Sequence, residues 1–286
     1  MELQVWNTNN TPEYNNLIKE KINNLVIEKK FTGTRLLNTK KTNFDILEKY
    51  VYDLSKIHTK NLNLTDNNYF VEFWFKNKFE TPCLHVDCDE YEKMEKSIYN
   101  YPLLSCVSYF NKTNTPTVVS NIDMDKFIYK EFHTDNNFSF SFPNINKHIT
   151  FNPSFFHGTA ILTDNYDLTE ERIIIAFNIW KTHPINIQYY DNYNYQSDYK
   201  ENNIFLINKN TDDIKNIPIS EQELNFDTME DILYNNNPNA FKKFNKWIDN
   251  SLTCHIIADK NIDLNIKNNK LINKYGTIIN DINYIK

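Results

Sequence analysis

The stretch Leu84-His85-Val86-Asp87 places a histidine and an aspartate two positions apart, and a further histidine, His157, follows much later in the chain. Side chains two positions apart on an extended strand point to the same side, so His85 and Asp87 can reach one ion. Two imidazoles and one carboxylate form the facial triad that binds non-haem Fe(II) and leaves coordination positions open. The spacing therefore predicts a β-rich fold in which a distant strand brings His157 beside this pair.

Arginine is rare in this chain, which draws attention to Arg172. Of 31 basic residues only Arg35 and Arg172 are arginine. A guanidinium offers a planar fork of donors to a carboxylate, whereas a lysine ammonium is a point charge. Arg172 begins an apolar stretch after the last candidate ligand, so we interpret it as the anchor for a buried carboxylate. Glycine is also rare, and Gly158 directly follows His157, where the backbone would pass close to a metal or ligand.

At these residues the chain resembles the 2-oxoglutarate- and Fe(II)-dependent dioxygenases, over residues 65 to 185. It looks most like the branch of the prolyl hydroxylases and their algal and viral homologues, in which a tyrosine, a hydrophobic residue and an asparagine end the strand after the metal-binding pair. The segments that carry the resemblance are His85-Val86-Asp87, Ser105-Cys106-Val107-Ser108-Tyr109-Phe110-Asn111, Pro116-Thr117-Val118-Val119, Phe151-Asn152-Pro153-Ser154-Phe155-Phe156-His157-Gly158 and Arg172-Ile173-Ile174-Ile175-Ala176-Phe177-Asn178-Ile179-Trp180.

The resemblance implies an oxidoreductase with a defined set of site residues. Its metal, Fe(II), would be bound by His85, Asp87 and His157. Arg172 would bind the distal carboxylate of the co-substrate 2-oxoglutarate, together with Tyr109, for which packing in the core is the alternative role. The oxidant would be O2, the co-products succinate and CO2, and ascorbate an optional stimulant. The favoured substrate is a protein side chain, ahead of a nucleobase or a small metabolite.

Two other classes of protein fit part of the pattern. A cupin-like metal-binding protein without oxygenase activity would use the same triad with another metal, and Arg172 and Tyr109 argue against it. A structural or interaction protein on a degenerate jelly-roll would have no physical reason to keep three metal ligands on converging strands. Cys83 and Cys88, one on each side of the triplet, do not match a recurring zinc pattern.

Composition narrows the remaining possibilities. The net charge of −6 and the isoelectric point near 5.7 argue against a broad phosphate-binding surface. Four cysteines without regular spacing indicate a reducing compartment, and we find neither a signal peptide nor an apolar run that would span a membrane. We therefore expect a soluble intracellular protein, in host cytoplasm or a virion, since the bias toward Asn, Lys, Ile and Tyr is typical of AT-rich giant viruses or protists. His58 and His148 lie in apolar segments, which indicates packing roles.

The hydrophobic pattern predicts two helices followed by a series of strands. Apolar residues recur at helical spacing from Leu17 to Val26, after Pro12, and again from Phe44 to Leu54, after a cap near Thr42. The predicted strands cover 69–75, 84–87, 103–110, 117–120, 138–142, 148–151 and 172–180. This order favours a mainly β fold with flanking helices (α+β), built on a double-stranded β-helix of the cupin-like jelly-roll type.

The same patterns divide the chain into three regions. These are an N-terminal helical support region (1–64), a double-stranded β-helix oxygenase core (65–186) and a C-terminal α/β extension of unknown role (187–286). The charged segment 88–101 predicts a solvated short helix or loop, with a lid over the substrate opening as the alternative. In the extension, 204–207 is typical of a strand, and 229–234 and 241–248 are typical of helices.

Overall fold

The structure is a computed structural model, and it describes most of the first two thirds of the chain and several strands beyond. The described residues are 3–27, 33–64, 69–78, 85–113, 115–123, 137–159, 171–190, 204, 206–208, 214–219, 252–257, 270–272 and 278–281. Within these ranges no helix has the length and apolar character needed to cross a membrane.

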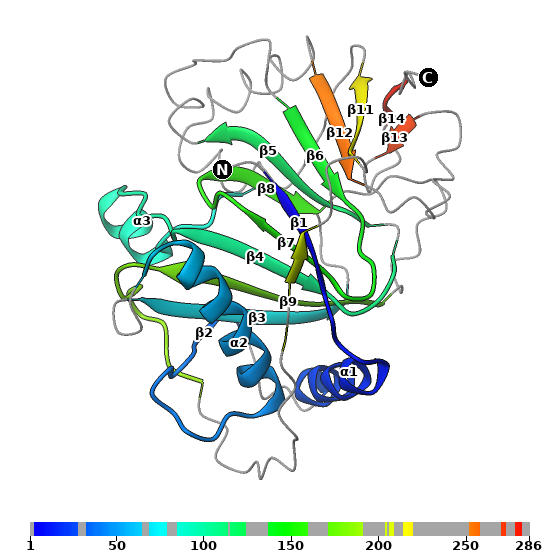
Figure 1. Cartoon of the computed structure of the whole chain (residues 1–286). Coiled ribbons are helices and arrows are strands. Elements are labelled where there is room, and N and C mark those ends of the chain that lie inside the picture. The colour runs from blue at the N-terminus through cyan, green and yellow to red at the C-terminus, as the bar shows by residue number, and fades with distance from the viewer. Residues whose placement is uncertain are drawn as a thin grey trace.

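Seven antiparallel strands form the larger sheet, in the order β10-β1-β7-β4-β9-β3-β2 (Figure 1). Their bounds are Leu206–Asn208 (β10), Gln4–Thr8 (β1), Lys147–Phe151 (β7), Leu104–Tyr109 (β4), Glu171–Trp180 (β9), Phe70–Lys78 (β3) and Arg35–Leu36 (β2). The central strands β4 and β9 therefore have hydrogen-bonded neighbours on both sides.

A smaller sheet has five strands in the order β11-β12-β6-β5-β8. Their bounds are Ile214–Ile219 (β11), Leu252–Ile257 (β12), Asn137–Ser141 (β6), Thr117–Asp123 (β5) and Phe155–Thr159 (β8). Only β12 and β6 pair in parallel. Two further strands, Lys270–Ile272 (β13) and Ile278–Asp281 (β14), pair with each other.

Helices α1 (Pro12–Ile27) and α2 (Ile46–Asn61) pack on the outer face of the larger sheet (Figure 1). Side chains on alternate positions of β4 and β9 separate into two buried clusters. Those facing the helices pack with them, namely Leu104, Cys106, Ile173, Ile175, Phe177 and Ile179. Those facing the smaller sheet pack with Val119 of β5, namely Val107, Tyr109, Ile174 and Ala176. Because both faces of β9 are buried, its middle part, residues 173–177, is an uninterrupted apolar run.

The start of α2 lies close to, but not at, the predicted cap. Asp45 accepts hydrogen bonds from the backbone N–H groups of Leu47 and Glu48, and the Glu48 carboxylate accepts from the Asp45 N–H. This capping box satisfies backbone donors that have no partner within the helix. The predicted cap near Thr42 was therefore wrong, because Asp45 is the residue whose carboxylate closes the box with Glu48.

Most predicted strands correspond to observed ones, with two informative differences. The segment 84–87 contains no strand in its described part, where His85 makes only an isolated bridge. The sequence missed β1 and β8, and β8 carries His157. Gly158 lies within β8 and weakens its strand pattern, since glycine is depleted in strands.

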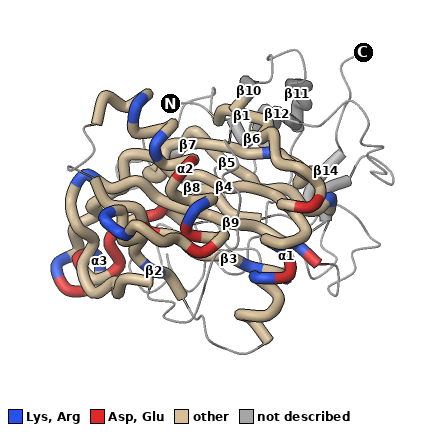
Figure 2. Tube along the Cα trace, turned by 60° about the horizontal axis from the view of Figure 1, so that its bottom comes forward, with Lys and Arg blue, Asp and Glu red and all other residues tan. Residues whose placement is uncertain are grey.

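The charged segment after the triplet contains a short helix, α3 (Glu90–Lys96), with no buried residue. The carboxylate of Asp89 caps it by accepting from two backbone N–H groups. Acidic and basic residues lie together along this helix (Figure 2), and they form ion pairs one turn apart.

The C-terminal extension is described only in part. A strand occurs where the sequence predicted one near 204–207, and β10, β11 and β12 all pair with strands of the two sheets. The predicted helices at 229–234 and 241–248 lie outside the described residues. The division of the chain into three regions remains a prediction.

Candidate metal centre

The backbone brings the two candidate histidine ligands together. His85 and His157 pair across an isolated antiparallel bridge, in which each backbone N–H donates to the other residue's carbonyl at 2.8 Å. The N–H of Asp87 donates to the carbonyl of Pro153 at 3.1 Å. The segment 85–87 therefore lies alongside the start of β8, which explains how residues so far apart in sequence share one site.

The three side chains converge on a common point. One potential ligand atom from each of His85, Asp87 and His157 lies within 4.8 Å of the other two. The Asp87 carboxylate lies 3.6 Å from Nε2 of His85 and 3.4 Å from Nε2 of His157. The His85 side chain is 39% exposed, whereas His157 is 7% exposed. The group is thus buried on one side and accessible from the other.

Neighbouring groups fix the orientation and charge of this triad. Nδ1 of His157 lies 2.8 Å from the carbonyl oxygen of Phe155, and a ring that donates there directs Nε2 toward Asp87. Burial would raise the pKa of Asp87, but His157, His85 and the Ser105 hydroxyl together lower it well below its usual range. Burial lowers the pKa of His157, and the Asp87 carboxylate reverses this to a net increase. Asp87 is therefore an anion, as a metal ligand must be.

A chain of buried polar side chains extends from Asp87 into the larger sheet. The hydroxyl of Ser105 lies 2.7 Å from Oδ2 of Asp87 and 2.8 Å from Oδ1 of Asn178. Asn178 and Trp180 both donate to Oε2 of Glu72, at 3.4 Å and 2.9 Å. Burial, assisted by the negative charge of Asp87, raises the pKa of Glu72 to about 7. These hydrogen bonds hold the Asp87 carboxylate in place from the side of the larger sheet, an arrangement that is typical of the partners of metal-binding carboxylates.

The triad lines a cavity of about 210 Å³ that is also lined by cationic side chains. Arg172, which is 3% exposed, lies in its wall with Lys76 and Lys78 of β3. The guanidinium donates to the Thr117 hydroxyl at 2.8 Å and to the Thr115 carbonyl at 3.3 Å. A rigid guanidinium in a cavity wall is suited to binding a carboxylate with fixed geometry.

The structure places Tyr109 behind this wall and not in the cavity lining. Its hydroxyl donates to Oγ1 of Thr117 at 2.7 Å, and its ring centroid lies 5.7 Å from Cζ of Arg172. Tyr109 is 1% exposed and belongs to the buried cluster between the sheets. Its contacts are those of a residue that positions Thr117 and Arg172.

Sequence reasoning did not assign a role to several residues of this site. The side chains of Trp74, Lys76 and Lys78 occupy alternate positions of β3 and all line the cavity. The sequence signal for Lys76 and Lys78 was their spacing of two positions directly after apolar residues, which places both lysine side chains on one face of a strand. Glu72, Asn178 and Ser105 had no such signal, because strand pairing alone brings them together.

Comparison with known proteins gives only distant likeness. No protein-family model matches the chain, and no curated protein matches it. Among solved structures it is similar to HygX from Streptomyces hygroscopicus with nickel and 2-oxoglutarate bound, at 12% identity and a TM-score of 0.39, over 66% of this chain and 85% of that one.

Two further solved structures show likeness at the same level. EctD from S. alaskensis with 2-oxoglutarate and 5-hydroxyectoine is 13% identical, with a TM-score of 0.42, over 62% of this chain and 71% of that one. The viral collagen prolyl hydroxylase of Paramecium Bursaria Chlorella virus-1 is 11% identical, with a TM-score of 0.37, over 63% and 90%. Likeness this distant assigns no role to any residue of this chain.

Proposed function

We propose that this protein is a 2-oxoglutarate- and Fe(II)-dependent dioxygenase built on a double-stranded β-helix. The observation that carries the proposal is the convergence of His85, Asp87 and His157 in the wall of a cavity that Arg172 also lines. Two imidazoles and one carboxylate suit Fe(II), since three protein ligands leave positions open for a co-substrate and O2. The donor set and its anionic carboxylate therefore fit the metal.

The residues around the cavity also fit 2-oxoglutarate, which carries two carboxylates. Arg172 would bind the distal carboxylate, and the contacts of Thr117 with both Arg172 and Tyr109 hold the guanidinium in place. Lys76 and Lys78 add positive charge to the same cavity. When bound, Fe(II) and 2-oxoglutarate supply the oxidising chemistry, with O2 consumed and succinate and CO2 formed.

The protein's own contribution is to hold the metal-binding side chains in a fixed orientation and to keep water away from them. His157 is held through its contact with the Phe155 carbonyl, and Asp87 through the Ser105 hydroxyl, so neither needs to reorganise when a metal binds. Phe151 packs on the His157 ring with ring centroids 4.6 Å apart and also lines the cavity, so it presents an apolar surface beside the triad. The exposed edge of His85 marks the side from which a substrate reaches the site.

We propose a protein side chain as the substrate, as in the prolyl hydroxylases that the chain resembles. The support is the sequence Tyr109-Phe110-Asn111, which has the tyrosine, hydrophobic residue and asparagine of that branch, with Tyr109 as the last residue of β4 and the other two directly after it. Hydroxylation of a small metabolite is the alternative. Peptide libraries and metabolite pools, each assayed for a mass increase of one oxygen atom, distinguish the two.

The experiment that tests the proposal is an anaerobic titration of the Fe(II) protein with 2-oxoglutarate, followed by visible absorption. Chelation of the metal by the 2-oxo acid end should give a weak charge-transfer band. His157→Ala should abolish the band, and His183→Ala, which changes an exposed histidine outside the cavity, should retain it. A band of equal strength in His157→Ala would contradict the assignment of the triad.

A further inference from the structure

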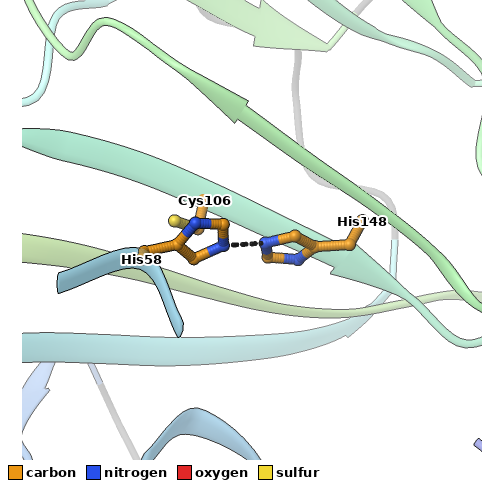
Figure 3. Close-up of side chains that lie close together, drawn as sticks. All are labelled: His58, Cys106 and His148. Atoms are coloured by element: carbon orange, nitrogen blue, oxygen red, sulfur yellow. Dashed lines mark hydrogen bonds between the residues drawn. The ribbon is translucent and has the colours of Figure 1, made fainter. Parts of the chain in front are cut away.

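A second group of potential metal ligands lies on the opposite face of β4 from the candidate metal centre. Ser105 contacts Asp87 on one face, and the next residue, Cys106, belongs to the buried cluster on the other. On that face Cys106 lies close to His58 of α2 and His148 of β7 (Figure 3). One potential ligand atom from each lies within 4.8 Å of the other two, and none of the three residues is more than 3% exposed.

The two imidazoles point their Nε2 atoms at each other. These atoms lie 2.9 Å apart, so without a metal one ring donates its proton to the other (Figure 3). Nδ1 of His148 lies 2.7 Å from the hydroxyl of Ser108. When that nitrogen donates to Ser108, the ring is fixed in the tautomer whose Nε2 lone pair faces His58. Such an outer-shell hydrogen bond is the usual way in which a metal-binding histidine is oriented.

The surroundings of this cluster keep both histidines neutral. Trp6 packs edge-on to His58 with ring centroids 6.1 Å apart, and Phe177 stacks on His148 at 5.9 Å. Burial lowers the pKa of His58 to about 4 and that of His148 well below its usual value. A neutral imidazole is the form that binds a metal. Burial also raises the pKa of Cys106, so its thiol keeps its proton until a metal displaces it.

We propose that His58, Cys106 and His148 bind one Cu(I) ion, which attaches α2 to the larger sheet. Soft thiolate ligands select Cu(I) and Zn(II) among the common ions. Among the described residues the cluster contains three donors, whereas structural Zn(II) sites generally use four protein ligands. Binding exchanges the thiol proton of Cys106 for the ion and changes no oxidation state.

Charge also favours the monovalent ion. Cu(I), one thiolate and two neutral imidazoles sum to zero, whereas Zn(II) with the same ligands leaves a net positive charge. An uncompensated charge among side chains as buried as these would be costly. The proposal does not depend on the proposed oxygenase function, because the two sites share no ligand.

The test is an anaerobic titration of the full-length protein with Cu(I) against a Cu(I) chelator, in a His157→Ala background that removes the other triad. We expect one Cu(I) per chain and a near-ultraviolet thiolate-to-copper absorption. Ser108→Ala should weaken binding about ten- to a hundredfold, as outer-shell changes do, and Cys106→Ala should weaken it further. The matched control is Cys88→Ala, which removes the other buried cysteine in the described part of the chain and should leave binding unchanged.

Two results would overturn the proposal. One is equal Cu(I) affinity in Cys106→Ala and its parent, and the other is tighter binding of Zn(II) than of Cu(I) in the same competition. If Cys106→Ala does not fold, X-ray absorption at the copper edge of the parent decides the question. One sulfur and two nitrogen neighbours support the site, and a spectrum without sulfur rejects it.

Discussion

Replacement of Ser105 by alanine should weaken Fe(II) binding without removing a metal ligand. The Ser105 hydroxyl lies 2.7 Å from Oδ2 of Asp87 and is 1% exposed, so no bulk water replaces it directly. A hydrogen bond to a charged group contributes roughly 1.5–3 kcal/mol. Loss of an outer-shell partner typically lowers metal affinity about ten- to a hundredfold, which corresponds to a similar free energy. We therefore expect a loss of about that size in Ser105→Ala.

The chain provides a closely matched control for this prediction. Ser108 lies on the same strand and is also buried, but it faces the other side of the sheet and contacts His148. Ser108→Ala should leave Fe(II) affinity unchanged, so competition with an Fe(II) chelator under anaerobic conditions separates the two variants. Unchanged affinity in Ser105→Ala, or an equal loss in Ser108→Ala, would refute the supporting role of the hydroxyl. For Cu(I) we expect the opposite result, with weaker binding in Ser108→Ala and unchanged binding in Ser105→Ala.

Three further predictions concern the co-substrate, the pH dependence and the fold. Arg172→Lys should weaken 2-oxoglutarate binding about ten- to a hundredfold at saturating Fe(II), because the charge remains but the two-pronged hydrogen bond is lost. Tyr109→Phe should cause a smaller loss of 2-oxoglutarate affinity. Unchanged affinity in Arg172→Lys would mean that another group binds the carboxylate. Because the pKa of Glu72 is raised to about 7 in the folded protein, its contribution to the free energy of unfolding is fully present below pH 4.5 and is lost, by about 3 kcal/mol, as pH rises through about 7. Urea unfolding at a series of pH values should show this loss in the parent and not in Glu72→Gln, and the same pH dependence in both proteins would contradict the prediction. Asp45→Ala should lower the free energy of unfolding by about 1 kcal/mol through loss of the α2 cap, and an unchanged urea midpoint would contradict that role.

Much of the fold could be predicted because hydrophobic periodicity reports which faces of an element are buried. The helix of 12–27 and the strands around β4 and β9 follow from such patterns, and the structure is a mainly β fold with flanking helices, as expected. Where the pattern is weak the prediction failed. Strand β8 is short and contains Gly158. In the described part of segment 84–87, His85 makes an isolated bridge to His157 and Asp87 adds one backbone hydrogen bond to Pro153, which does not amount to a strand.

The candidate site shows the same limit at the level of side chains. His85, Asp87 and His157 could be grouped from residue type and spacing, and the structure brings them together. Partners that meet only through strand pairing could not be grouped. Glu72 meets Asn178 because β3 and β9 are in that register, and no local pattern encodes this register.

The cluster of His58, Cys106 and His148 is a further example of residues that sequence patterns could not group. The sequence indicated packing roles for His58 and His148, and both are buried. It gave no reason to place them beside Cys106, because the three residues come from a helix and two strands that tertiary packing alone brings together.

The most direct test of the central claim is the fate of oxygen atoms during turnover of 2-oxoglutarate. The Fe(II) protein is supplied with 2-oxoglutarate and isotopically labelled O2, and succinate is analysed by mass spectrometry. Atom balance requires that loss of CO2 from the 2-oxo acid be matched by one new oxygen in the succinate carboxylate. We predict labelled succinate from the parent protein and none from His157→Ala. Metal binding without any labelled succinate from the parent would contradict the assignment of this protein as a dioxygenase.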